Sequence, residues 1–118
     1  MKLIYIAGPY RAPTTWGIAE NIHAARMAGA MVAQLGAYPV IPHSNTAHMD
    51  GIASDDLWLS GTLELMRRCD GVILIPGWKR STGSKNEHAE AIRLGLPVFE
   101  WDEGRLGGGV GSFLRGLK

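Results

Sequence analysis

Apolar residues along the chain gather in short runs that are separated by longer amphipathic stretches. Four such runs predict buried strands, each bounded by glycine, proline or polar residues, and they cover residues 2–7, 38–41, 71–76 and 96–100. Between these runs the apolar spacing changes to that of a helix face. It predicts three helices: one that follows the candidate N-caps Thr14 and Thr15 and ends near Gly36, one with Leu59, Leu63 and Met66 on one side, and one over residues 84–94 that ends at Gly95.

The alternation of strands and helices predicts the fold class. Parallel strands that are joined by helices form a sheet that is covered on both faces. With right-handed crossovers we expect an α/β three-layer sandwich with a parallel sheet of four or five strands, flavodoxin-like or Rossmann-like. This domain covers residues 1–103, and the glycine-rich tail at 104–118 is expected either to be flexible or to order against a second subunit. Residues 43–56 lack periodicity, which predicts a long loop of the kind that is often functional.

The composition excludes several classes of protein. The chain has 118 residues, enough for one domain, and a net charge of +1, with its 12 lysines and arginines scattered along the sequence. Proteins that bind nucleic acid usually carry a basic face. Because the basic residues of this chain are scattered, we expect no nucleic-acid partner. The sequence shows no signal peptide and no apolar stretch long enough to span a membrane. Its single cysteine, Cys69, cannot form an internal disulfide. We therefore expect a cytoplasmic protein with no membrane partner.

Polar and charged side chains collect where the predicted strands end. In open parallel sheets, ligands bind outside the carboxyl ends of the strands. Those ends bring together Gly8 and Arg11 after the first strand, His43 after the second, and the segment 77–87 after the third. The sequence therefore predicts one ligand site that is formed by three loops far apart along the chain.

The segment Ser81-Thr-Gly-Ser-Lys-Asn-Glu87 is typical of a small anion site. Gly83 lies in a turn that opens a helix, where free backbone N–H groups and the helix dipole attract a phosphate. The hydroxyls of Ser81 and Ser84 add further donors. The spacing is not that of a Walker A loop, and no GxGxxG motif begins at Gly8. We expect a site for one phosphate, and because the chain has no HExxH, CxxC or similar motif we expect no metal and no organic cofactor.

Each candidate residue also has a purely structural interpretation. Ser84 and Glu87 fit a capping box, in which the carboxylate folds back onto the backbone N–H of Ser84. Tyr5 can equally be a core residue, and Trp78 either stacks on a base or covers the sheet edge. For the other side chains, the structural alternatives are a surface position for Arg11, a loop position for His43 and packing for Trp58.

Taken together, these motifs resemble the nucleoside 2-deoxyribosyltransferase superfamily. The resemblance runs from near the start of the chain to about residue 100, and its segments are Ile4-Tyr-Ile-Ala-Gly-Pro-Tyr-Arg11, Arg68-Cys-Asp70 through Pro76-Gly-Trp78, and Ser81-x-Gly83-x-x-x-Glu87-x-x-x-Ala91. The chain looks most like a small phage and bacterial branch of that superfamily. It is also similar in arrangement to the 2'-deoxynucleoside 5'-monophosphate N-hydrolases.

The resemblance implies a role for each main candidate. It makes Glu87 the nucleophile that attacks C1' of the sugar, and it makes Tyr5 the hydrogen-bond partner that holds the carboxylate in line and keeps it ionised. A serine at position 81 is typical of the members that act on 5'-phosphorylated substrates, and Arg11 matches an arginine of the hydrolases. Ser112 loosely resembles part of a segment by which one subunit completes its neighbour's phosphate site. Dimers are usual in the superfamily, so the resemblance implies a homodimer. The expected partner is a small-molecule nucleotide.

One position departs from the superfamily pattern. Thr62 stands where these proteins usually carry an acid/base aspartate, eight residues before Asp70, and the nearest replacements are Asp55 and Asp56. Three functions are therefore possible. The first is an N-glycosidic bond hydrolase or base-exchange transferase that acts on nucleoside 5'-monophosphates through a glycosyl–Glu87 intermediate. The second is a nucleotide-binding module without turnover, and the third is a plain flavodoxin-like protein in which Glu87 is a helix cap. The first is the one that the resemblance favours.

Overall fold

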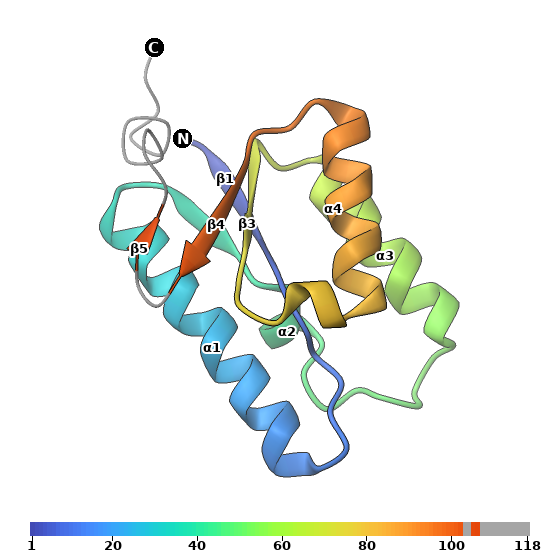
Figure 1. The fold of residues 1–118 in the computed structure, drawn as a ribbon. Coiled ribbons are helices and arrows are strands. Elements are labelled where there is room, and N and C mark those ends of the chain that lie inside the picture. The colour runs from blue at the N-terminus through green and yellow to red at the C-terminus, as the bar shows by residue number, and fades with distance from the viewer. Residues whose placement is uncertain (103–104, 107–118) are drawn as a thin grey trace.

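The computed structural model describes residues 1–102 and 105–106, in which strands and helices alternate as expected (Figure 1). The strands are β1 (Leu3–Ala7), β2 (Tyr38–Val40), β3 (Gly71–Leu74), β4 (Val98–Asp102) and β5 (Arg105–Leu106). The helices are α1 (Thr15–Gln34), α2 (Pro42–Asn45), α3 (Asp55–Arg67) and α4 (Thr82–Leu94), with one 3-10 turn, η1 (Trp78–Arg80).

The strands form one sheet in the order β2-β1-β3-β4-β5. The first four are parallel, and β5 pairs with β4 in the antiparallel sense. This order has its reversal between β1 and β3, as in flavodoxin-like sheets. The predicted α/β sandwich is confirmed, and its four-stranded parallel sheet carries an extra short antiparallel strand at one edge. In Figure 1 the carboxyl ends of β1 and β3 lie at the lower end of the sheet, where α4 begins.

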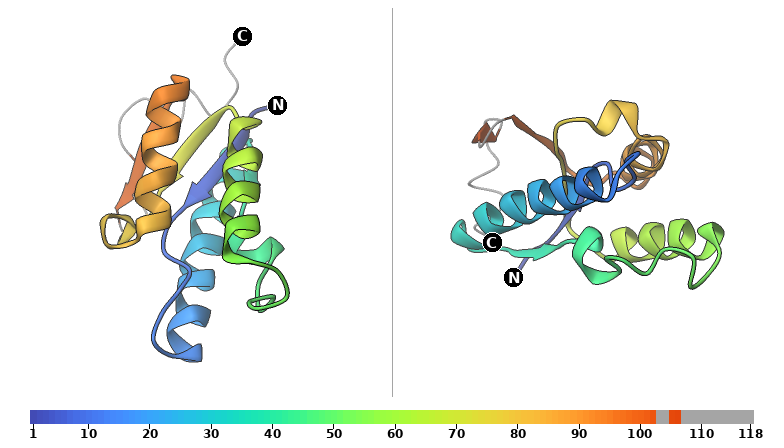
Figure 2. Two further views of the ribbon diagram at one scale, coloured as in Figure 1. Left: turned by 90° about the vertical axis from the view of Figure 1, so that its right-hand side faces the viewer. Right: turned by 90° about the horizontal axis from the view of Figure 1, so that it is seen from below.

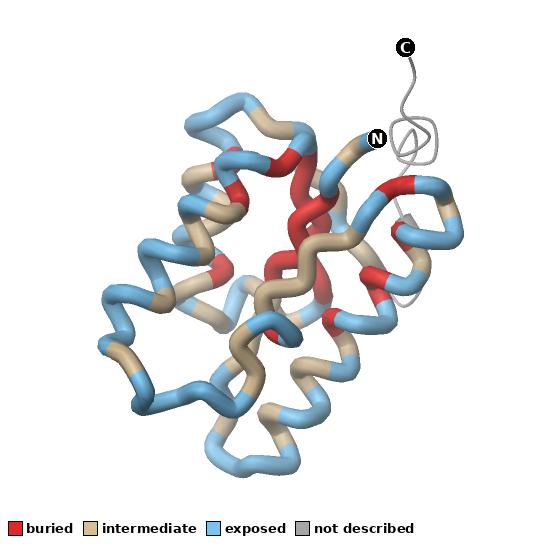
Figure 3. The backbone as a smooth tube through the Cα atoms, turned by 180° about the vertical axis from the view of Figure 1, so that it is seen from behind, coloured by how far each residue is buried: buried red, intermediate tan, exposed pale blue. Residues whose placement is uncertain are grey.

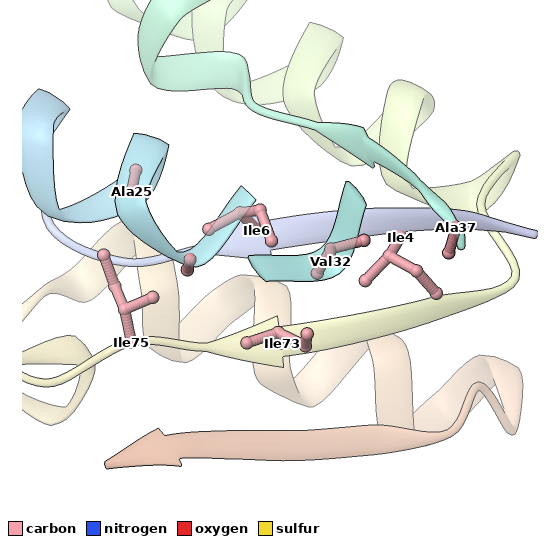
Figure 4. Packing of buried hydrophobic residues seen from close by; sticks show 8 residues of the cluster. Ile4, Ile6, Ala25, Val32, Ala37, Ile73 and Ile75 are labelled. Atoms are coloured by element: carbon pink, nitrogen blue, oxygen red, sulfur yellow. The ribbon is translucent and has the colours of Figure 1, made fainter. Parts of the chain in front are cut away.

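One face of the sheet packs against α1. Ile4 and Ile6 of β1 and Ile73 of β3 point to this side, where they meet the small face of α1 formed by Ala25, Ala28 and Val32 (Figure 4). Successive residues of a strand point to opposite faces, so this layer uses alternate positions. The helix approaches the sheet closely because Gly29 faces β2 and the residue after it: a Cβ at that position would lie 3.3 Å from Cβ of Pro39 and 2.5 Å from Cδ1 of Ile41.

The other face of the sheet is covered by α3 and α4, which run side by side (Figure 2). Tyr5, Val72 and Leu74 pack here against Met66 of α3 and Ala91 of α4. Both central strands are therefore buried on both sides, as the red centre of Figure 3 shows. This arrangement places Tyr5 under the two helices that border the predicted ligand site.

Three local predictions need correction. Residues 43–45 are not loop but part of α2, a single turn that begins at Pro42, where the fixed φ of proline favours a helix start. The helix predicted over 84–94 begins at Thr82, because the side chain of Ser81 caps it. Residues 105–106 of the predicted tail form β5, and the remainder of that tail, with the candidate Ser112, lies outside the described residues. Within the described ranges, no helix combines the length and apolar composition that crossing a membrane requires.

Candidate active site

A cleft of about 750 Å³ opens beside the carboxyl ends of β1 and β3. Its walls are the loop after β1, the α2 turn, the start of α3 and the start of α4. This is the position at which open parallel sheets bind ligands. Most residues that the sequence singled out lie in its lining: Gly8, Arg11, His43, Ser81, Gly83, Ser84 and Glu87. A recess of about 20 Å³ between α3 and α4 shares Thr62 and Glu87 with the cleft.

The carboxylate of Glu87 is held by the hydroxyl of Tyr5. Tyr5 is fully buried in β1, and its hydroxyl donates a hydrogen bond to Oε2 of Glu87 in α4. The capping-box interpretation of Glu87 is wrong. The N-cap of α4 is Ser81, whose Oγ accepts the backbone N–H of Ser84 at 3.2 Å, so the carboxylate is not folded back onto its own helix terminus.

Burial governs the charge of Glu87. Removal from water raises the pKa of this carboxyl to about 7, while the hydrogen bond from Tyr5 and the neighbouring hydroxyl of Thr62 act in the opposite direction. The hydrogen bond from Tyr5 favours the ionised form, as expected, but desolvation outweighs it, so the expectation that the carboxyl is kept ionised at neutral pH needs correction. The pKa of Tyr5 is itself raised well above its usual value, first by burial and then by the neighbouring carboxylate, so the phenol remains a donor.

Thr62 lies beside this pair, on the facing side of α3. Its hydroxyl donates to the carbonyl of Leu59 at 3.0 Å and is near enough to Glu87 to lower the pKa of that carboxyl. Neither candidate replacement carboxylate is among the groups that shift the pKa of Glu87. Asp55 pairs with Arg11 at 2.7 Å, and Asp56 is exposed and does not line the cleft. Neither is placed as an acid/base partner of Glu87.

The loop after β1 is fixed by Gly8 and His43. A Cβ at Gly8 would lie 2.2 Å from Cγ1 of Ile75, so only glycine lets this turn pass over the sheet. Nε2 of the buried His43 donates to the carbonyls of Gly8 at 3.0 Å and Pro9 at 3.2 Å. Because both partners are acceptors, Nε2 carries the proton and Nδ1 is a lone-pair acceptor. Burial lowers the pKa of His43, which is consistent with the neutral ring.

Two adjacent residues of this loop reach across the cleft. The Tyr10 hydroxyl donates to Oδ1 of Asp50 at 2.8 Å, and the Arg11 guanidinium pairs with Oδ1 of Asp55 at 2.7 Å. All four side chains line the cleft. The β1 loop is therefore tied to the segment that precedes and begins α3.

The start of α4 offers hydrogen-bond donors to the cleft. The first four N–H groups of a helix have no partner within it, and Ser81 satisfies two of them, those of Ser84 and Lys85. The N–H groups of Thr82 and Gly83 have no acceptor within the described part of the chain. The hydroxyl of Ser84 is buried and also lacks a partner among the described residues. This wall can receive an anion.

Two tryptophans differ from expectation. Trp78 does not line the cleft: its ring packs 4.7 Å from that of His88, and its indole N–H donates to Oε1 of Glu100 at 3.3 Å. Trp78 also packs against the core between the sheet and the helices α3 and α4, so the structure does not bring it to the cleft. Trp58, which we assigned to packing, lines the cleft. It precedes Thr62 by one helical turn, and that spacing could have identified it.

No group of three His, Cys, Asp or Glu side chains within the described residues is placed to hold a metal ion.

Two solved structures share this fold. The 2-desoxiribosyltransferase from Leishmania mexicana superposes with a TM-score of 0.61 at 22% identity, over 86% of this chain and 64% of that one. The 2-deoxyribosyltransferase from the psychrotolerant bacterium Bacillus psychrosaccharolyticus gives 0.63 at 21% identity, over 83% of this chain and 70% of that one. The chain spans just under two thirds of the Leishmania protein. At sequence identities this low, the likeness shows a shared fold and nothing more.

No curated protein matches the chain. The two solved structures support the resemblance to deoxyribosyltransferases at the level of the fold. A protein-family model matches residues 2–101, which include all of β1 to α4 and nearly the whole of the parallel sheet. The chain belongs to the family that this model describes, Domain of unknown function (DUF7768).

Proposed function

We propose that the protein cleaves the N-glycosidic bond of nucleoside 5'-monophosphates, with Glu87 as the nucleophile. The observation that carries the proposal is the hydrogen bond from Tyr5 to the Glu87 carboxylate at the wall of the cleft. A carboxylate that is held by a phenol, and not by its own helix, has a fixed direction and a second oxygen free to react. The fold in common with two deoxyribosyltransferases supports the same class of chemistry.

The proposed reaction has two steps. First, an oxygen of Glu87 attacks C1' of the sugar, the O–C1' bond forms as the C1'–N bond breaks, and the electron pair of that bond leaves with the base. The base nitrogen takes up a proton from water. Second, a water oxygen attacks C1', the ester bond to Glu87 breaks, and the water's proton passes to solvent. A second nucleobase in place of this water turns hydrolysis into base exchange.

Water is assigned the role of proton donor because of Thr62. A threonine hydroxyl does not release a proton near neutral pH, and Asp55 is engaged by Arg11. The cleft, at about 750 Å³, has room for water beside a nucleotide. The consequence is a slow first step, because the leaving base lacks a positioned acid.

The start of α4 is the proposed phosphate site. Gly83 and Ser84 offer a free amide and a free hydroxyl on the same wall as Glu87, and Ser81 fixes the helix start that presents them. A phosphate there benefits from the positive end of the helix dipole. The sugar then lies over Glu87, and the base extends toward Trp58 and the loop after β1.

Base release from a panel of substrates tests the proposal. Each nucleoside 5'-monophosphate, in ribose and deoxyribose form, and each matching nucleoside is incubated with the pure protein, and free base is measured by chromatography. We expect release from at least one monophosphate and none with Glu87→Gln. Intact-mass measurement under acid quench should find a glycosyl adduct on wild type alone. Folded protein, verified by circular dichroism, that releases no base from the whole panel contradicts the proposal.

A second candidate function is a nucleotide-binding module without turnover. Thr62 is the observation that favours it, since the recess between α3 and α4 that Thr62 and Glu87 line holds no second carboxyl group. This alternative predicts that wild type binds a monophosphate without releasing base. It also predicts that Glu87→Ala retains or increases the affinity, because removal of a carboxylate reduces repulsion of the phosphate.

A further inference from the structure

Arg80 presents a cationic side chain to the cleft without a carboxylate partner. It is the last residue of η1, directly before the Ser81 cap, and it lies in the lining of the cleft. The other arginine there, Arg11, is paired with Asp55. No ion pair joins Arg80 to any acidic side chain of the described residues. The unbalanced positive charge on this wall therefore comes from Arg80.

The guanidinium of the exposed Arg80 lies over the turn at Gly77. A Cβ placed on Gly77 would lie 3.3 Å from Nη2 of Arg80 and 3.3 Å from Cγ of Pro9. The Arg80 side chain thus folds back over the turn and reaches the loop after β1. Gly77 has a φ of 92°, a conformation that favours glycine, and its missing side chain leaves the space that the guanidinium uses. The charge therefore lies near both of the loops that follow the central strands.

A second group points to the same ligand. The hydroxyl of Ser84, which is 1% exposed, has no hydrogen-bond partner among the described residues and lies in the same wall one turn along. A buried hydroxyl without a partner is rare in proteins and indicates a missing ligand or water. A guanidinium donates two parallel N–H bonds to a phosphate. The neutral hydroxyl of a free nucleoside cannot accept this pair of bonds.

We infer that Arg80 binds the 5'-phosphate of the substrate and determines the preference for nucleotides over free nucleosides. The inference rests on the proposed function for the identity of the substrate, but it concerns binding and is tested by binding. In this assignment the phosphate lies between the Arg80 guanidinium and the free N–H groups and hydroxyl at the start of α4. Arg11 remains engaged with Asp55.

Removal of the charge at position 80 tests the inference against a matched control. Lys79 is the neighbouring residue with the same charge, but its Nζ lies over the Trp78 ring, 5.7 Å from the centroid, and it does not line the cleft. We compare Arg80→Gln with Lys79→Gln on the full chain, by calorimetric titration with a nucleoside 5'-monophosphate and with its nucleoside. Arg80→Gln should weaken monophosphate binding by about tenfold or more, as for the loss of a charge-assisted hydrogen bond, and leave nucleoside binding unchanged. Lys79→Gln should change neither by more than about twofold.

The outcomes separate this inference from the proposed function. If Arg80→Gln lowers monophosphate affinity selectively while wild type releases no base, Arg80 is a phosphate ligand and the glycosidase proposal fails. If wild type releases base but both glutamine variants bind the monophosphate equally well, the glycosidase stands and the role of Arg80 is refuted. Titration with inorganic phosphate provides a second readout: phosphate should compete with the monophosphate on wild type, and its own affinity should fall by about tenfold or more in Arg80→Gln. Folded wild type that binds neither the monophosphate nor phosphate also overturns the inference.

Discussion

The Tyr5 hydroxyl donates a hydrogen bond to the Glu87 carboxylate across 82 positions of sequence. The contact exists because β1 lies at the centre of the sheet and α4 begins at its carboxyl end. Tyr5 is inaccessible to solvent, so its hydroxyl has little choice of partner. The pair couples the direction of the carboxylate to its charge, since the same hydrogen bond that orients Glu87 also lowers its pKa against the effect of burial.

Tyr5→Phe should therefore change both the rate and the pH dependence of base release. Loss of the hydrogen bond removes an effect that lowers the pKa of Glu87, so the acid limb of kcat/KM, expected near the pKa of about 7, should move to higher pH. We expect kcat at its plateau to fall by about tenfold or more, because the carboxylate loses its fixed direction. Tyr38→Phe, at an exposed position in β2, is the control. An unchanged pH profile in Tyr5→Phe would refute the coupling.

Glu87→Gln should stabilise the folded protein at high pH. The folded-state pKa of about 7 lies above the value near 4.3 of an unfolded glutamate, so between these values the folded state binds more protons. Stability of wild type is therefore lost as pH rises through this window, and glutamine escapes the loss. We expect the variant to gain up to about 3 kcal/mol at about pH 8.5 and little at about pH 4.5, measured by urea unfolding. Equal gains at both pH values would contradict the assignment.

The sequence alone predicts the strands of the parallel sheet, because each strand is a dense apolar run with no competing interpretation. Residues 71–76 contain β3, and Ile4-Tyr-Ile-Ala contributes most of β1. The sequence was also sufficient to bring Tyr5 and Glu87 to one site, since the order of strands and helices places both beside the carboxyl ends of the central strands. The choice between cap and nucleophile was not accessible from local pattern. Ser81 and Ser84 both fit the N-cap of α4, and only packing of the helix start decides that Ser81 takes it.

Other features depend on tertiary contacts that no local pattern encodes. The α2 turn is a four-residue helix, and its His43 is buried through hydrogen bonds to carbonyls 34 and 35 residues away. The orientation of Trp78 follows from the η1 turn, which a loop assignment does not specify. The role that we propose for Arg80 is not apparent from the sequence, because a basic residue next to another basic residue is usually a solvated surface position.

Asp55→Asn should increase the affinity for a nucleoside 5'-monophosphate. The substitution removes a carboxylate from the cleft and releases Arg11, so the wall becomes more positive. Both partners are about two thirds exposed, with side-chain values of 69% and 67%, so the pair contributes little to stability. We expect affinity to rise by about two- to fivefold and the free energy of unfolding to change by less than about 1 kcal/mol. Asp56→Asn, which removes an exposed charge outside the cleft, is the control, and an equal effect of both variants would indicate general electrostatics.

Thr62→Asp should accelerate base release if the missing acid limits the reaction. A second carboxyl beside the buried Glu87 titrates with it as a pair, and one of the two stays protonated near neutral pH. That proton becomes available to the leaving base. We expect kcat to rise by about tenfold or more near pH 6, measured by release of free base, with Thr62→Asn as the isosteric control that carries no acid. If the aspartate and asparagine variants behave alike, the first step is not limited by protonation.

Ser84→Ala should separate a functional hydroxyl from a structural one. The Ser84 side chain is buried, and its oxygen has no partner within the described residues, so its removal deletes an unsatisfied polar group and leaves no other group unpaired. We expect the free energy of unfolding to stay within about 1 kcal/mol of wild type or to increase. Affinity for a monophosphate should fall by about tenfold, since a hydrogen bond to a charged phosphate is lost, while affinity for the nucleoside should not change. Ser60→Ala, at an exposed position of α3 outside the cleft, is the matched control. A destabilised Ser84→Ala with unchanged affinity would place the hydroxyl in the scaffold and remove it from the phosphate site.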